Sequence, residues 1–196
     1  GAAGALLNHQ PSAQALQTIA QAHREYGTTA FLPTLITDTW EQMVNAVTTV
    51  TAAVKVGVPG ILGIHLEGPY LNEERKGVHP AKRIRAPSIY EDLNHLFDVF
   101  PAHLIKLMTL APERVSTEFI QQLIRHGMIV SAGHTEATYD QMQIALAHGV
   151  TGFTHLFNAM SPMTSREPGV VGAALDHAHS WCGLIVDGHH VHPVTL

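Results

Sequence analysis

Short apolar runs and stretches with helical spacing alternate along the whole chain. Strands are predicted at six short apolar runs bounded by turn residues, at 28–36, 60–66, 104–110, 128–132, 150–154 and 181–186. Helices are predicted where apolar residues recur every three or four positions, at 11–26, from Thr37 or Asp38 to about Val56, and at 88–100, 116–126 and 138–148. Strand alternating with helix predicts a parallel sheet with right-handed crossovers.

The choice of α/β architecture depends on where the polar residues fall. The dinucleotide-binding fingerprint is absent. Polar side chains that could bind a metal or take part in catalysis follow several different strands, which favours a (βα)₈ TIM barrel over an open sheet. About six of the eight units are present. Because such a barrel usually takes about 250 residues, we expect a single, incomplete barrel domain over residues 1–196, with the first and last strands missing. Pro33 interrupts the first predicted strand and is expected to mark the end of that strand that lies at the functional site.

Composition narrows the class of protein and its partners. The chain is 45% hydrophobic and 14% charged, which predicts a globular protein with its own core. The net charge of −5 and the lack of a Lys/Arg cluster argue against a nucleic-acid partner. No apolar run approaches the ~20 residues that a membrane span needs, so no membrane partner is expected. The single cysteine, Cys182, favours a reducing, cytoplasmic setting and is expected to be a buried strand residue.

Three side chains that bind metals follow predicted strands. Glu67 comes directly after the run 60–66, and His134 and His155 end the runs at 128–132 and 150–154. Because catalytic groups collect at the carboxyl ends of parallel strands, we expect these residues to share one divalent metal ion. Two histidines and one carboxylate are the ligands of catalytic zinc and of non-haem iron. The spacing alone is a weak signal, and for either histidine by itself a hydrogen-bonded loop position is the favoured interpretation. The placement of both at the ends of consecutive units favours the metal.

Five sequence blocks together resemble a known family. They are HLEGPYLNEERKGVHP, LAPE, VSAGHTEATYDQ, THLFNAMSPMTSREPGVVGAAL and DGHHVHP. These blocks run through nearly the whole chain and resemble the N-acetylglucosamine-6-phosphate deacetylases of the amidohydrolase superfamily. The resemblance implies a (βα)₈ barrel in which Glu67, His134 and His155 hold one divalent ion, zinc or iron, and a homodimer in which part of the phosphate site comes from the neighbouring subunit.

The same resemblance implies roles for further residues. Asn158 and Ala159 would bind the sugar phosphate through their backbone, Arg166 and His79 would contact the phosphate, and His190 would contact the acetamido group. The implied reaction converts N-acetylglucosamine 6-phosphate to glucosamine 6-phosphate and acetate, with a metal lowering the pKa of a bound water toward about 7. The proton carrier implied is an aspartate after the eighth strand, which this chain lacks. We therefore expect the 196-residue chain alone to be inactive.

Simpler alternatives remain for several of these positions. Arg166 would also fit an ion pair with Glu167, and His79 would also fit a solvated basic loop with Arg75 and Lys76. N-acetylgalactosamine 6-phosphate is a competing substrate, because specificity at one hydroxyl depends on a few loop side chains. A non-catalytic, truncated barrel that binds sugar phosphate is the alternative outside the enzyme class.

Overall fold

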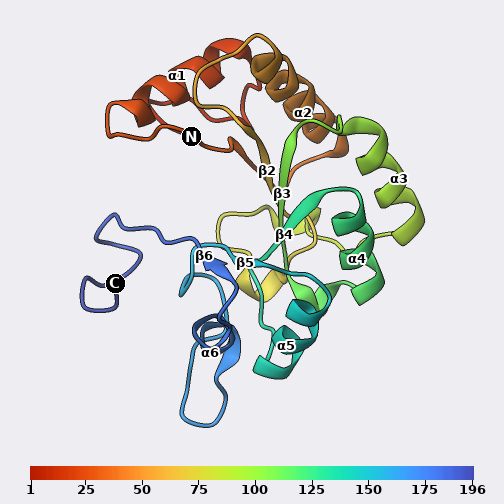
Figure 1. Cartoon of the computed structure of the whole chain (residues 1–196), viewed down its shortest axis with the longest axis vertical. Coiled ribbons are helices and arrows are strands. Elements are labelled where there is room, and N and C mark those ends of the chain that lie inside the picture. Colours follow the sequence, from red (N-terminus) through yellow and green to blue (C-terminus); the bar gives the residue numbers. More distant parts are fainter. The chain divides into compact units, whose positions relative to one another are not determined.

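Strands and helices alternate in the computed structural model, which describes the backbone of residues 1–196 and every side chain except those of Ile89 and Tyr90. Within these described residues the strands are β1 (Thr34–Ile36), β2 (Gly63–Glu67), β3 (Ile105–Leu110), β4 (Met128–Ala132), β5 (Gly152–Phe153) and β6 (Trp181–Cys182). The helices are α1 (Ala13–Arg24), α2 (Trp40–Lys55), α3 (Ile89–Val99), α4 (Thr117–Arg125), α5 (Tyr139–Ala147) and α6 (Gly169–Asp176) (Figure 1). The connecting segments contain 3₁₀ turns η1 (Glu73–Arg75), η2 (Ala81–Arg83) and η3 (Pro112–Arg114). The strand order in the sheet follows the chain, β1 to β6, which confirms the predicted α/β fold with six strands.

Polar side chains begin most of these helices where the sequence predicts. Ser12, Ser116 and Thr138 accept hydrogen bonds from backbone N–H groups in the first turns of α1, α4 and α5. The cap predicted for α2 is wrong by one or two positions, since Thr39 accepts the N–H of Gln42 in place of Thr37 or Asp38. The reason is local, because the Thr37 hydroxyl donates to the Glu67 carbonyl and the Asp38 carboxylate accepts the Thr39 N–H. No helix in the part of the chain described here is both long and apolar enough to cross a bilayer.

The first of two compact units consists of residues 1–67 and 88–107. Its strands β1 and β2 are parallel, with Leu35 opposite Leu66 and Ile36 opposite Glu67. β1 is much shorter than the predicted 28–36, because it begins only after Pro33, which has no N–H to give to a ladder. The Pro33 carbonyl accepts the His65 N–H at 3.0 Å. Pro33 therefore precedes the strand, and the expectation that it marks the end at the functional site is wrong.

The second unit consists of residues 68–87 and 108–196. Here β4, β5 and β6 pair in parallel, with Ala132 opposite Phe153 and Phe153 opposite Cys182. The core of this unit includes fully or almost fully buried apolar side chains from the strands and from α4, among them Met108, Leu110, Phe119, Leu123, Val130 and Phe153. α4 packs against β4, and α5 packs against α4 and α6. The candidate functional residues follow the carboxyl ends of these strands.

β6 ends earlier than predicted and is exposed. It covers Trp181 and Cys182, whereas the apolar pattern predicts a strand to residue 186. Its partner β5 ends at Phe153, and beyond it His155 takes a left-handed backbone conformation (φ 37°), so residues after Gly183 have no extended strand to pair with. Cys182 is exposed, so the prediction of a buried cysteine is wrong. Among the described strands, only β5 pairs with β6, which leaves β6 at an edge of the sheet.

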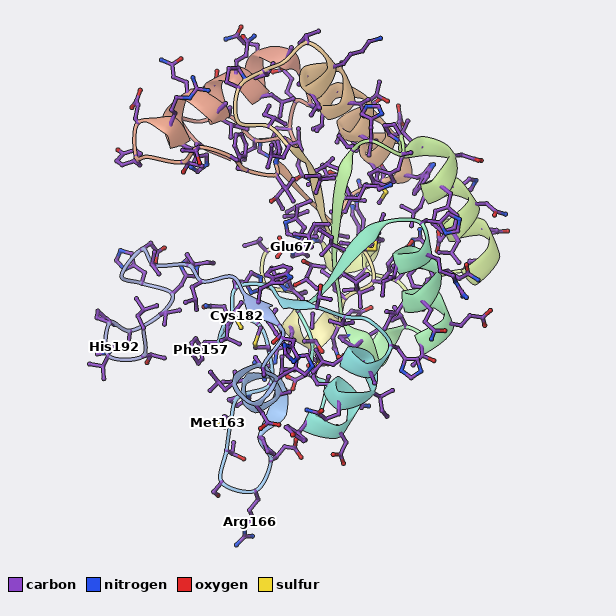
Figure 2. All side chains as sticks on the ribbon, viewed as in Figure 1. Glu67, Phe157, Met163, Arg166, Cys182 and His192 are labelled. Atoms are coloured by element: carbon purple, nitrogen blue, oxygen red, sulfur yellow. The ribbon has the colours of Figure 1, made fainter. Side chains whose placement is uncertain are left out.

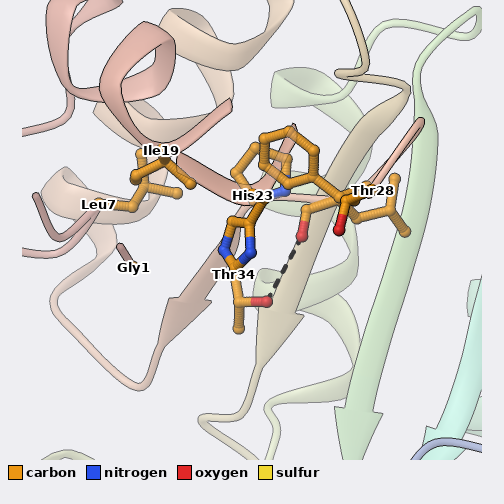
Figure 3. A pocket seen from close by; sticks show the side chains of 9 residues that line it. Gly1, Leu7, Ile19, His23, Thr28 and Thr34 are labelled. Carbon is orange, nitrogen blue, oxygen red and sulfur yellow. Dashed lines mark hydrogen bonds between the residues drawn. The ribbon is translucent and has the colours of Figure 1, made fainter. Parts of the chain in front are cut away.

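A cavity of about 290 Å³ lies within the first unit (Figure 3). Leu7 and Ile19 contribute apolar surface to it, and the Thr34 hydroxyl donates to the Leu32 carbonyl at 3.5 Å beside it. The polar side chains of its lining are two threonines and His23, whose ring lies 5.8 Å from that of Phe31. None of the predicted site residues lines this cavity, so the search for the functional site turns to the histidines of the second unit.

Candidate metal centre

Two predicted ligands, His134 and His155, lie side by side in the second unit. His134 follows β4 and His155 follows β5, and these strands are neighbours in the sheet. The Nε2 atoms of the two rings are 3.1 Å apart, and the ring planes stand at 85° to each other. His134 is buried and His155 is half-buried. Two residues separated by a whole helix in the sequence thus meet at one point, as their positions at neighbouring strand ends predict.

Backbone carbonyl groups fix the proton positions of both rings. The Nδ1 atom of His134 is 2.6 Å from the Arg75 oxygen, and that of His155 is 3.1 Å from the Asn158 oxygen. A carbonyl oxygen only accepts hydrogen bonds, so each Nδ1 carries a proton, and in its neutral form each ring directs the lone pair of Nε2 toward the other ring. Two lone pairs repel at this distance, and a cation that both nitrogens bind relieves the repulsion. Histidines that ligate metals usually make this kind of N–H···O=C bond with their other nitrogen.

The separation of the two Nε2 atoms agrees with a shared metal ion. Two nitrogens bound at about 2.0–2.1 Å to one ion lie roughly 3.3 Å apart at a tetrahedral angle and roughly 2.9 Å apart at a right angle. The observed 3.1 Å falls between these values. Neutral imidazoles suit zinc and iron alike, so the donor type does not select one of these metals. The residues present therefore fit the divalent ion that the sequence predicts.

His79 lies against His134 and extends the cluster. Its ring centroid is 4.4 Å from that of His134, and a ring nitrogen of each lies within 4.8 Å of the other. The side chain is only 2% exposed, which excludes the alternative of a solvated basic loop. Sequence analysis assigned His79 to the phosphate and missed its contact with His134. The only signal for this contact was its place in a Gly- and Pro-containing loop between two strands.

Glu67 is the last residue of β2 (Figure 2), and it ends the first of the two segments that form the first unit. The residue is 9% exposed, and all five residues of β2 are buried. Burial of a carboxylate is costly unless the group is paired, hydrogen-bonded or bound to a cation. Its position directly before the turn at Gly68 is the one that sequence analysis predicts for a metal ligand.

The backbone around the two histidines is unusual. Among the described non-glycine residues, positive φ occurs at His134 (50°), His155 (37°), Phe157 (79°), Ala159 (51°) and at one residue near the N-terminus. Such conformations are disfavoured for residues with a Cβ atom and cluster at functional sites, where surrounding bonds enforce them. The coiled turn after β5 directs the Asn158 carbonyl to His155 and the Ala159 carbonyl to the Thr135 N–H. The predicted sugar-phosphate residues Asn158 and Ala159 therefore belong to the same turn as a proposed metal ligand.

Arg166 lies near the tip of the loop between β5 and α6 (Figure 2). Its side chain is exposed. The neighbouring Glu167 carboxylate accepts the backbone N–H of Tyr139 at 3.0 Å and of Gly169 at 3.3 Å, at the first residues of α5 and α6. Both bonds go to the Oε1 atom of Glu167, so this carboxylate holds the two helix ends together.

His190 lies in the segment that follows β6 and is half-exposed, at 49% of its side chain. Its Nδ1 atom is 2.7 Å from a carboxylate oxygen of Asp187. The backbone N–H groups of His190 and His189, together with the His190 ring, hold the pKa of Asp187 well below its usual range. Within the second unit His190 is thus oriented by Asp187.

Known proteins similar to this chain share one activity in their names. The chain is 45% identical over 195 residues to N-acetylgalactosamine-6-phosphate deacetylase of Shewanella sp. (strain ANA-3), covering 100% of this chain and 49% of that protein. It is 40% identical over 194 residues to N-acetylglucosamine-6-phosphate deacetylase of Haemophilus influenzae, covering 97% and 49%. No family profile matches the chain.

Solved structures give the same result. The N-acetylglucosamine-6-phosphate deacetylase of Pasteurella multocida superposes with a TM-score of 0.87 at 41% identity, covering 97% of this chain and 50% of that one. The enzyme of Mycobacterium smegmatis superposes with a TM-score of 0.91 at 35% identity, covering 99% and 50%. The chain spans about half the length of the relatives it matches. The resemblance and the fold class predicted from the sequence are therefore confirmed, and both epimer names occur among the homologues.

Proposed function

We propose that this chain forms part of a metal-dependent N-acetylhexosamine-6-phosphate deacetylase that converts N-acetylglucosamine 6-phosphate to glucosamine 6-phosphate and acetate. The observation that carries the proposal is the His134–His155 pair, with Nε2 atoms 3.1 Å apart and both Nδ1 atoms bonded to carbonyl oxygens. The names of the homologues support the reaction and the substrate class. In the same proposal residues 1–196 form one incomplete barrel domain, and the protein works in the cytoplasm as a homodimer.

The proposed ligands of one divalent ion are Glu67, His134 and His155, with zinc or iron as the metal. Glu67 supplies a negative charge that two neutral imidazoles lack, and it stands at the end of a buried strand. When bound, such an ion would lower the pKa of a water and polarise the acetamido carbonyl. His79 packs edge-to-face on His134 and restricts the rotation of that ring. The proposal also retains the contact of His79 with the substrate phosphate.

The proposed contacts to substrate come from the turns around this cluster. Asn158 and Ala159 would hold the sugar phosphate through their backbone. Both carbonyl groups are bonded within the protein, and the Asn158 N–H donates to the His155 carbonyl at 2.9 Å, so this N–H would have to be shared with the phosphate or released to it. Arg166 presents a guanidinium with five donors, which suits a phosphate dianion. Its exposed position on a long loop supports a phosphate site shared between the subunits of a dimer.

His190 is proposed to stabilise the acetamido oxygen as that oxygen gains negative charge. Its bond to Asp187 engages Nδ1, so the contact with substrate is assigned to Nε2. Asp187 is a poor candidate for the proton carrier, because its lowered pKa keeps it ionised and a general acid works best near the operating pH. A carboxylate outside these 196 residues is therefore part of the proposal.

N-acetylgalactosamine 6-phosphate is the second candidate substrate. The Shewanella relative, 45% identical, carries that name. The two epimers differ at one hydroxyl, which a site that hydrogen-bonds the correct hydroxyl can discriminate strongly. Comparison of kcat/KM on both 6-phosphates in the complete protein decides between them, and hydrolysis of neither would favour the non-catalytic alternative.

Metal analysis tests the central claim. The complete protein, purified without a histidine tag, should contain about one zinc or iron ion per chain. Glu67→Gln and His134→Ala should lose most of it, because each removes one of the proposed ligands. His179→Ala is the matched control, since His179 is exposed and belongs to the same unit. Full metal retention in both ligand variants would exclude the assignment.

A further inference from the structure

Glu113 is the centre of a hydrogen-bond network that the proposed chemistry does not use. It lies in η3, directly after β3. One carboxylate oxygen accepts the Asn72 side-chain N–H at 2.9 Å and the Glu136 backbone N–H at 2.8 Å. The other oxygen accepts the Thr135 hydroxyl. A single carboxylate thus joins the segments that follow β2, β3 and β4, and all of its partners belong to the second unit.

These partners surround His134 in the sequence and in space. The Asn72 N–H donates to the His134 carbonyl at 2.9 Å, and the same segment supplies the Arg75 carbonyl that binds His134 Nδ1 at 2.6 Å. Thr135 is fully buried, and its backbone N–H donates to the Ala159 carbonyl at 3.1 Å. Glu113 therefore holds the two residues that follow His134, the Asn72 side chain and, through Thr135, the turn that carries His155.

The conformation of His134 explains why such a network is needed. Its φ of 50° is left-handed, and a residue with a Cβ atom keeps this conformation only when its surroundings enforce it. Hydrogen bonds to an ionised carboxylate are about twice as strong as neutral ones. The Arg75–Glu136 ion pair ties the same two segments together at a second point. Both carboxylate oxygens of Glu113 point at donors of the protein, which is the geometry of a supporting residue and not of a ligand.

We propose that Glu113 is a positioning residue of the metal centre, which fixes the backbone at His134 and the contact between the Thr135 and Ala159 segments so that the two imidazoles converge. This inference rests on the proposed metal site. Residues that orient metal ligands typically change metal affinity 10–100-fold when they are removed. Glu113 does not bond to the His134 ring itself, and it acts through the two residues that follow His134 and through Asn72, whose backbone N–H donates to the His134 carbonyl.

The test compares Glu113→Ala and Glu113→Gln with wild type in the complete protein. Glu113→Gln keeps one acceptor oxygen for Asn72 and Glu136, whereas Glu113→Ala removes every bond. Zinc affinity, measured by competition with a chelator at a temperature where all variants are folded, should fall about 10–100-fold in the alanine variant and less in the glutamine variant. Glu118→Ala is the control, because Glu118 is an exposed carboxylate five residues away.

Amide hydrogen exchange in the zinc-free protein gives a readout that does not depend on metal. Glu113→Ala should speed exchange at residues 135–137 at least 10-fold. Unchanged exchange there, or zinc affinity equal to wild type in both Glu113 variants, would overturn the positioning role. A wild-type protein that binds no zinc would instead overturn the proposed metal centre, so the two failures are distinguishable.

Thr135 provides a second route to the same answer if Glu113→Ala does not fold. Thr135→Val keeps the shape but removes the hydroxyl that donates to Glu113 and accepts the Ala137 N–H at 3.0 Å. It should weaken zinc binding, and Thr135→Ser should restore it because the hydroxyl returns. Equal zinc affinity in the valine and serine variants would overturn the network as the cause.

Discussion

The turns that carry His134 and His155 differ sharply from the segments that carry Arg166 and His190, although all four belong to the second unit. The two histidine turns are tied to each other and to the core by backbone carbonyl bonds, and their rings already meet. Arg166 and His190 are exposed. The two imidazoles that suit a metal ion lie together, whereas Arg166 and His190, which are proposed to contact the substrate, lie on exposed segments.

The difference shows what each kind of binding needs. A metal ion tolerates errors of only about 0.2 Å in ligand distance, so its ligands must be held by the core and by bonds to the backbone. A phosphate presents several oxygens to long, flexible side chains, which adjust when it binds. Changes in the histidine turns should therefore abolish function, and changes in the exposed segments should reduce it in a graded way.

The largest effect is expected from His155→Ala. Removal of this imidazole deprives the ion of a ligand and leaves the His134 Nε2 without its neighbour at 3.1 Å. Metal catalysis contributes several kcal/mol, so kcat/KM should fall by on the order of 10³-fold or more in the complete protein. Steady-state kinetics and metal content should change together. An active, metal-free His155→Ala protein would show that activity does not depend on a metal ion bound by the two histidines.

An intermediate effect is expected from Arg166→Ala. Loss of a charged hydrogen-bond donor to phosphate costs on the order of 2 kcal/mol, or about 30-fold in kcat/KM. The loss should be confined to the phosphorylated substrate, so N-acetylglucosamine without phosphate should be hydrolysed as by wild type. Arg125→Ala serves as the control, since Arg125 is an exposed arginine in the last turn of α4. Equal losses on both substrates would show that Arg166 supports the fold.

Elements with a clear period could be predicted from the sequence almost to the residue. β4 has the predicted bounds, and α4 and α5 lie within one residue of theirs, because their apolar spacing is bounded by Gly127 and Gly149. α6 had no predicted bounds, since Gly169 to Ala174 are all buried and give no amphipathic pattern. β5 and β6 are shorter than their apolar runs, because the left-handed residues after β5 end the ladder and sequence propensity does not show this.

Some contacts of the candidate site could likewise be predicted from the sequence, and others could not. The meeting of His134 and His155 follows from strand order alone, so the sequence was sufficient to predict it. The burial of His79 against His134 and the three bonds to Glu113 depend on how separate loops fold over each other. No local spacing encodes these contacts, and only the folded structure shows them.

The smallest effect is expected from Asp187→Asn, which tests the exposed segment that carries His190. The carboxylate accepts the backbone N–H groups of His189 and His190 and holds the His190 ring, and these bonds keep its pKa below its usual range. A lowered pKa means that the ionised carboxylate stabilises this turn above the ordinary value of about 3.9, and that the benefit is lost as the pH falls through the lower folded value. Asp187→Asn should therefore speed amide exchange at residues 189 and 190 by a few-fold at pH 5–7, with wild type keeping its protection down to pH 4. Because the group is exposed, the overall melting temperature should barely change. If wild type and variant exchange equally at pH 6, Asp187 does not order this turn, and the proposed orientation of His190 would have to come from the substrate itself.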